Sequence, residues 1–216
     1  WEETGRWESM DDLYKVKDRQ ERQFALGPTH EEVITDIVRK RTMSYKDLPL
    51  YLYQMQTKFR DELRSKSGLL RGREFIMKDL YSFHVSEEDT KKYYEIAKKA
   101  YVKVFKRCGL ATIFTEASGG SFSKEVSHEF QVPTESGEDL VIFCGKCDFA
   151  KNIEIADKKV GEPCPLCGNI LSEAKSIEVG NIFTLGTRFS SLMNAAFTDK
   201  DGSAKPMIMG CYGMGL

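Results

Sequence analysis

The sequence predicts an α+β protein, an antiparallel sheet flanked by helices with a small zinc ribbon inserted. Two aromatic and apolar stretches, 50–62 and 71–84, flank a turn-like segment at 65–68, which favours two antiparallel strands joined by a loop. Residues 86–109 have the apolar periodicity of an amphipathic helix. Four cysteines in two close pairs have a spacing typical of a zinc site.

The composition indicates a globular protein that does not enter a membrane. The chain has 216 residues, of which 41% are hydrophobic and 30% charged, and its net charge of -1 gives no strong nucleic-acid footprint. It contains neither an apolar run of membrane length nor a signal peptide. We therefore expect a cytoplasmic location. The chain starts at Trp1 and ends within a glycine pattern at Leu216, which suggests a fragment of a longer protein.

A helix is predicted to begin after the Gly27-Pro28 break. Thr29 and Glu32 have the spacing of a capping box. The following apolar residues recur at helical spacing and predict one apolar stripe, formed by Val33, Ile34, Ile37 and Val38.

Alternation along the two central strands assigns their side chains to faces, because residues two apart share a face. One face collects Lys58, Arg60, Glu62, Arg71, Arg73, Phe75, Met77, Asp79 and Tyr81. Arginines suit phosphate oxygens and an aromatic ring can stack on a base, so this face fits a charged, planar ligand. A solvated outer face with ordinary surface salt bridges is the alternative.

The remaining elements follow from local signals. Ser86 is the expected N-cap of the long helix, whose aromatic stripe we interpret as core packing, and Gly109 ends it. Strands are expected at 111–115 and 127–132, with a turn at 118–121. A further strand that leads into a short helix is expected over 177–190.

The cysteines form a C-x2-C pair, sixteen intervening residues and a second C-x2-C pair: Cys144, Cys147, Cys164 and Cys167. Four thiolates hold zinc tetrahedrally and close its coordination shell, so we expect a structural rather than a catalytic Zn²⁺. Gly145 and Gly168 are expected to permit the tight turns. A degenerate site without metal is the alternative, and disulfides are not expected without a signal peptide.

Several of these stretches carry a family resemblance. Phe59–Glu62 followed by Arg71–Phe75 resembles motif 2 of the class II aminoacyl-tRNA synthetases, and Met77–His84 is similar to the bacterial type of prolyl-tRNA synthetases. The resemblance implies the class II antiparallel sheet and ATP-dependent activation of proline to prolyl-adenylate, followed by transfer to tRNA(Pro). It also implies Mg²⁺ with ATP and a homodimer in the full-length protein.

The resemblance further implies residue roles. Thr29 and Glu31 would bind the amino group of proline. Arg60 would be the catalytic contact to the α-phosphate of ATP and to the proline carboxylate. The remaining ATP contacts would be Glu62 to the adenine amino group, Arg71 to the outer phosphates and Phe75 stacked on adenine. The proline pocket would also include Met77, Asp79, Tyr81, His128 and Cys211, and the loop at 64–68 would meet the tRNA acceptor end.

Plainer roles remain open for four of these residues. Thr29 fits a helix cap, Glu31 a favourable charge at the helix N-terminus, His128 a satisfied structural histidine, and Cys211 a small buried hydrophobe. Two alternatives to the whole function also remain: a class II paralogue that activates an amino acid without charging tRNA, and an inactive scaffold carrying a zinc-ribbon interaction module.

The predicted organisation is a first part of the catalytic core at 1–140, an inserted zinc-ribbon-like segment at 141–172 and a second part at 173–216, truncated in motif 3. The family's large editing domain occupies the place of this short segment. We therefore expect the editing domain to be absent here and expect no intrinsic hydrolysis of alanyl-tRNA.

Overall fold

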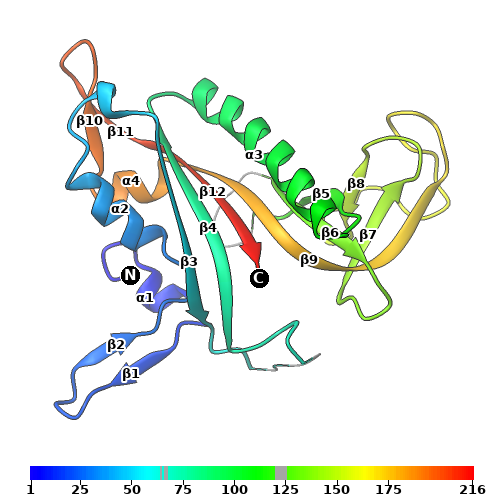
Figure 1. The fold of residues 1–216 in the computed structure, drawn as a ribbon, viewed down its shortest axis with the longest axis horizontal. Helices are drawn as coiled ribbons and strands as arrows, with labels where there is room; N and C mark the ends of the chain where they lie inside the picture. Colours follow the sequence, from blue (N-terminus) through cyan, green and yellow to red (C-terminus); the bar gives the residue numbers. More distant parts are fainter. Residues whose placement is uncertain (64, 66–67, 120–125) are drawn as a thin grey trace. The chain divides into compact units, whose positions relative to one another are not determined.

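The computed structural model describes residues 1–63, 65, 68–119 and 126–216 (Figure 1). The chain divides into two compact units. The first holds residues 1–90 and 185–216, and the second holds residues 91–184. Among the described residues, no helix is long and apolar enough to span a membrane.

The first unit is built on three antiparallel strands, in which β4 (Glu74–His84) lies between β3 (Leu50–Phe59) and β12 (Ile208–Gly215). The β3–β4 register runs from Leu50 opposite Phe83 to Phe59 opposite Glu74, so the predicted strand pair is confirmed. The smaller elements of this unit have the following bounds: α1 (Arg6–Ser9), β1 (Lys15–Lys17), β2 (Gln23–Ala25), α2 (Glu31–Arg39), η1 (Tyr45–Asp47), α4 (Arg188–Leu192), β10 (Ala196–Thr198) and β11 (Ala204–Pro206).

Helix α2 differs from its prediction. His30, not Thr29, is the N-cap residue, and no side chain caps the helix. The hydroxyl of Thr29 instead donates to the Glu31 carboxylate, and Glu32 binds Arg6. The predicted capping box is therefore wrong, because both of its side chains are used in a buried polar cluster.

The predicted apolar stripe of α2 is only partly buried. Val38 belongs to the core at 1% exposed, whereas Val33 and Ile37 are about half exposed, at 47% and 49%. The buried residues of α2 are Glu31, Glu32, Thr35 and Val38. The two carboxylates have buried partners, so the helix turns their side inward as well.

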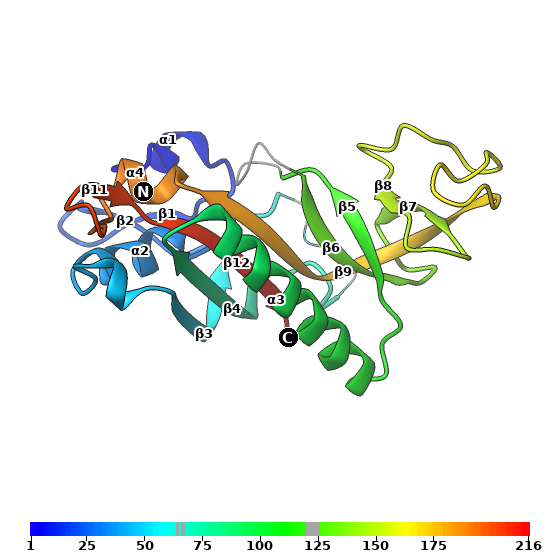
Figure 2. The ribbon, with the colours of Figure 1, turned by 90° about the horizontal axis from the view of Figure 1, so that it is seen from above.

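The second unit contains most of α3 (Glu87–Arg107) and five strands: β5 (Ile113–Ala117), β6 (Ser127–Pro133), β7 (Asp139–Cys144), β8 (Ala150–Asn152) and β9 (Leu171–Gly186). Their order is β9-β6-β5-β8-β7, and β7 also pairs with β9, so the order closes on itself (Figure 2). This confirms the two strands and the long helix that the sequence predicts in this region.

Helix α3 begins and ends as expected. The Ser86 hydroxyl accepts from the backbone N–H of Asp89 at 3.2 Å, and Gly109 after the helix has a φ of 78°. On its buried side, the rings of Tyr101 and Phe105 lie 5.4 and 5.3 Å from that of Phe130 in β6. The aromatic stripe is therefore core packing, as predicted.

Candidate functional site

The buried charged side chains of the described residues lie together in one compact unit. Lysine, arginine, aspartate and glutamate are almost never fully buried unless they are paired. The acidic and basic side chains buried in the described part of the chain all belong to the first unit: Arg6, Glu31, Glu32, Lys58 and Asp79. They come from α1, α2, β3 and β4, so the fold gathers them from distant parts of the sequence.

Glu31 has three neighbours on its carboxylate. Its Oε2 accepts from the hydroxyl of Thr29 at 2.5 Å and from Arg6 Nη1 at 3.3 Å, while its Oε1 lies 3.6 Å from the Cys211 thiol. Because Thr29 donates its only hydroxyl proton to Glu31, its oxygen lone pairs stay available as acceptors. Thr29 and Glu31 therefore present acceptor atoms at one point.

The second buried pair joins the two strands. Lys58 Nζ lies 2.7 Å from Asp79 Oδ2 and 3.2 Å from His30 Nδ1, and Gln54 Nε2 lies 2.7 Å from the same His30 nitrogen. Burial and the Lys58 charge lower the pKa of His30, so its Nδ1 is an unprotonated acceptor at neutral pH. Burial raises the pKa of Asp79, and Lys58 opposes that shift.

The floor of the cluster is formed by β4 and β12. Tyr81 pairs with Cys211 and Asp79 with Gly213, so these four residues share a face of the sheet. Burial raises the pKa of Tyr81 and of Cys211 well above their usual values, so both stay protonated. The Tyr81 hydroxyl is buried and faces the backbone of His30.

The predicted ATP residues lie at the other, more exposed end of the same strand pair. The Arg60 guanidinium lies 5.1 Å from the ring centre of Phe75, a cation–π contact. Arg60 Nε also lies 3.4 Å from the carbonyl oxygen of Pro28, and Arg71 Nε lies 3.1 Å from Glu62 Oε2. The structure thus brings the four predicted nucleotide residues together in two contacting pairs.

Two of the expectations involve other parts of the chain. His128 lies in the second unit, where its Nδ1 is 2.7 Å from the Tyr94 hydroxyl and its ring stacks on Phe114 at 4.5 Å. Burial lowers its pKa. A role for His128 in proline binding stays a prediction. The predicted loop at 64–68 and the predicted turn at 118–121 fall partly outside the described residues.

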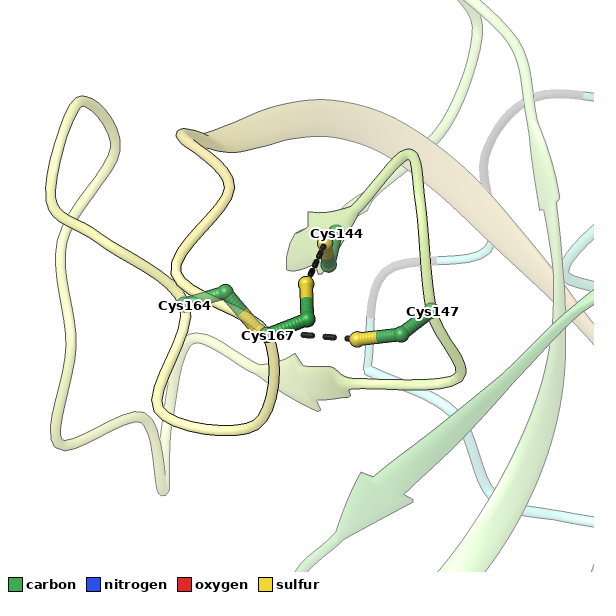
Figure 3. Close-up of side chains that lie close together, drawn as sticks. All are labelled: Cys144, Cys147, Cys164 and Cys167. Carbon is green, nitrogen blue, oxygen red and sulfur yellow. Dashed lines mark hydrogen bonds between the residues drawn. The ribbon is translucent and has the colours of Figure 1, made fainter.

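The four cysteines meet in the second unit, and their sulfur atoms all lie within 4.8 Å of one another (Figure 3). The Cys144–Cys167 and Cys147–Cys164 sulfur pairs are each 3.5 Å apart. Tetrahedral zinc with Zn–S bonds of about 2.3 Å requires sulfurs about 3.8 Å apart, so this donor set fits the metal.

The backbone around the cysteines supports them. The N–H of Lys146 points at Cys144 Sγ at 3.4 Å and, with other local donors, lowers the pKa of that thiol to about 6. Gly168 has a φ of 75°, as a tight turn requires. Gly145 does not have a left-handed φ, and a Cβ at this position would meet nothing within 4 Å, so the structure shows no reason for glycine to help this turn.

Sequence reasoning missed four members of the buried cluster: Arg6, His30, Gln54 and Glu32. Lys58 was placed on the correct face but given no partner. Alternation along β3 would have placed Gln54 on the face of Lys58. No local signal points to Arg6, because it acts on α2, 25 residues further along the chain.

Known proteins similar to this chain carry the same fold and related sequences. Residues 14–216 match the family described as tRNA synthetase class II core domain (G, H, P, S and T). Over 220 residues the chain is 47% identical to the probable mitochondrial proline--tRNA ligase of Rattus norvegicus, covering all of this chain and 46% of that protein. It is 34% identical to the proline--tRNA ligase of Sulfurihydrogenibium sp. over an alignment of 363 residues, which covers all of this chain and 64% of that protein.

Solved structures agree on the fold. A prolyl-tRNA synthetase from Cryptosporidium parvum complexed with L-proline and AMP matches 98% of this chain, and 37% of its own, with a TM-score of 0.71 and 16% identity. The Giardia lamblia prolyl-tRNA synthetase in complex with prolyl-adenylate matches 94% of this chain, and 35% of its own, with a TM-score of 0.71 and 20% identity.

The matches show the family of the chain and the share of its relatives' length that the chain covers. It spans 46% to 64% of the length of the two curated relatives described above. The Sulfurihydrogenibium alignment is longer than the 216 residues of this chain, so that relative carries additional residues within the aligned region. Because the family match extends from residue 14 to residue 216, this chain belongs to the class II tRNA synthetase core domain family (G, H, P, S and T).

Proposed function

We propose that this chain binds proline and ATP and catalyses formation of prolyl-adenylate, as the catalytic core of a proline--tRNA ligase. The curated relatives described above are named as proline--tRNA ligases, and the matching solved structures hold proline with AMP or prolyl-adenylate. For the amino-acid end of the site, the main support from the chain itself is an excess of negative charge in the buried cluster.

The buried cluster contains more carboxylates than cations. Among the described residues, three buried carboxylates face two buried cations. Asp79 is paired with Lys58, while Glu31 and Glu32 share Arg6. One negative charge is therefore left without a full partner at Glu31. A buried charge needs a counter-charge, and the ammonium group of an amino acid supplies it.

The acceptors at this point suit a secondary ammonium. Proline brings two N–H donors, and the oxygen of Thr29 and Oε1 of Glu31 offer two acceptors. Met77, Asp79, Tyr81 and Cys211, which follow on the same face of the sheet, would line the proline ring.

The nucleotide would bind at the exposed end. Arg60 would contact the α-phosphate and the proline carboxylate, and would balance charge while the carboxylate attacks phosphorus. Glu62 would accept from the adenine amino group, Arg71 would bind the outer phosphates and Phe75 would stack on adenine. Mg²⁺ would accompany ATP. No side-chain nucleophile is needed, because the substrate carboxylate attacks and the enzyme supplies position and charge.

Thermal shifts with non-hydrolysable adenylate analogues test the proposal. A ligand that binds only the folded state raises the melting temperature, so the proline analogue should raise it while alanine and threonine analogues should not. The Arg60→Ala variant should lose the shift with the proline analogue. Equal shifts with all three analogues would refute proline selectivity, and their absence in the unsubstituted chain would refute the adenylate site.

The complete reaction would transfer proline to tRNA(Pro) in a homodimeric protein in the cytoplasm. The short connection between β8 and β9 leaves no room for a large inserted domain there. We therefore propose that the protein does not hydrolyse alanyl-tRNA itself. Rapid deacylation of alanyl-tRNA by the purified full-length protein would contradict this.

The four cysteines would bind one structural Zn²⁺ through Cys144, Cys147, Cys164 and Cys167. Two of these cysteines pack into a small apolar core with Ile142, Phe149 and Leu171, so the metal would tie the ribbon to that core. Elemental analysis should find one zinc per chain in the unsubstituted protein and much less in Cys147→Ser. Exposed Cys108→Ser is the matched control and should keep the metal.

A further inference from the structure

Arg6 is the contact that distinguishes Glu31 from an ordinary buried acid. It is 4% exposed and belongs to α1, far from α2 in sequence. Its Nη1 lies 3.3 Å from Oε2 of Glu31 and 3.1 Å from both carboxylate oxygens of Glu32. One guanidinium thus holds two buried carboxylates from adjacent positions of one helix.

Without Arg6, no positive charge would hold the two carboxylates in place. Like charges that share a buried site repel one another. The other groups that face Glu31 carry no positive charge: Thr29, His30, Glu32 on α2, Asp79 and Tyr81 on β4, and Cys211 on β12. A displaced Glu31 would no longer present its charge to an ammonium.

We infer that Arg6 is a positioning residue for the amino-group site: it holds Oε2 of Glu31 and so aims Oε1 of Glu31, which also faces the Cys211 thiol, at the ligand nitrogen. The inference rests on the proposed function. Arg6 itself would not touch the substrate, because its contacts are taken by the far side of the Glu31 carboxylate and by Glu32.

The N-terminal segment offers a matched control. It is anchored to α2 a second time, by Glu3, whose carboxylate lies 2.6 Å from Arg39 Nη1. Arg39 also donates to the carbonyl of Met193 at 2.6 Å and does not contact Glu31. Arg39→Met therefore loosens the same segment without removing the charge beside Glu31.

The test measures binding of two ligands by isothermal titration. One is a non-hydrolysable prolyl-adenylate analogue, and the other is its cyclopentane counterpart, which has the ring but no nitrogen. Arg6→Met should weaken the prolyl ligand by about tenfold or more, as for loss of a hydrogen bond to a charged group, and leave the cyclopentane ligand within about twofold. Arg39→Met should leave both within about twofold, and Arg6→Lys should restore part of the prolyl affinity.

If Arg6→Met does not fold, Arg6→Gln takes its place, because it keeps a polar side chain without the charge. It should likewise weaken the prolyl ligand and leave the cyclopentane ligand within about twofold.

The titration results distinguish a failure of the positioning role of Arg6 from a failure of the proposed function. If the unsubstituted chain binds neither ligand, or binds both equally, the proposed amino-group site is wrong. If the unsubstituted chain prefers the prolyl ligand and Arg6→Met weakens both ligands equally, or weakens neither, the positioning role is wrong and the proposed function stands.

Discussion

Replacement of Lys58 by methionine should destabilise the first unit strongly. The Lys58 and Asp79 side chains are only 1% and 6% exposed, with Nζ and Oδ2 2.7 Å apart. Removal of one partner leaves a buried carboxylate without its counter-charge, which typically costs about 3–5 kcal/mol. The cost should be at the lower end of this range because Asp79, whose pKa burial already raises, can take up a proton.

The same reasoning fixes the pH dependence of this effect. In Lys58→Met the pKa of Asp79 in the folded state should lie further above its unfolded value. A raised carboxyl pKa contributes stability below the unfolded pKa and loses it as pH rises through the folded pKa. The penalty of Lys58→Met should therefore be larger at pH 8 than at pH 5.

Urea unfolding followed by tryptophan fluorescence measures the stability loss of Lys58→Met in the first compact unit of the chain. Trp1 and Trp7 are the two tryptophans of the chain, and both belong to the first unit. The unfolding midpoint should fall while the slope against urea stays constant. Lys40→Met removes an exposed ion pair with Asp36 and should cost no more than about 1 kcal/mol.

A double variant separates lost charge pairing from lost packing. Lys58→Met/Asp79→Leu removes both charges and should recover most of the stability, because a buried ion pair is often replaced by apolar residues at little cost. The reasoning would be refuted by a Lys58→Met loss no larger than that of Lys40→Met. A double variant as unstable as the single one would point to packing instead of charge.

Three further changes test other parts of the structure. Burial, and then the charge of Glu178, raise the pKa of Glu129 to about 7. The chain should therefore lose up to about 3 kcal/mol of stability between pH 4.5 and pH 8. Glu129→Gln should make the stability less dependent on pH, as measured by urea unfolding followed by circular dichroism. Gly210→Ala would place a Cβ 2.5 Å from the Tyr212 hydroxyl and should cost about 1–3 kcal/mol in the tryptophan assay; an unchanged midpoint would show that the site relaxes freely. Ser86→Ala removes the cap of α3 and should cost about 1 kcal/mol, whereas Ser86→Asp should cost little; equal losses would exclude a capping role.

Much of the fold follows from local pattern. Alternation places Phe75, Met77, Asp79 and Tyr81 on one face, and the observed register keeps them there. The cap, the aromatic stripe and the final glycine of α3 are all encoded within one stretch of sequence. The cysteine spacing alone likewise indicates a cluster, because a tight turn within each C-x2-C pair brings its two sulfurs together.

The errors concern α2, where tertiary partners override local preference. Thr29 and Glu32 fit a capping box, but both side chains have other partners. Thr29 donates to neighbouring Glu31, and Arg6 reaches Glu32 from another part of the sequence only after the chain has folded. The buried face of α2 is polar for the same reason, so its apolar residues Val33 and Ile37 remain exposed. A hydrophobic pattern reports which side of a helix is apolar, but not which side finds a partner.

The exposure of the proposed site residues differs from the nucleotide end of the site to the amino-acid end. Arg71 at one end is 48% exposed, Arg60 next to β3 is 35% exposed, and Glu31 at the other end is 1% exposed. A highly charged phosphate chain is stabilised where arginines still contact water, and a small amino acid is selected where water is excluded. The carboxylate and the α-phosphate would therefore meet between these ends, at Arg60. The Arg60 guanidinium is partly exposed and contacts Phe75, Pro28 and Asp12, whereas Lys58 is buried between Asp79 and His30.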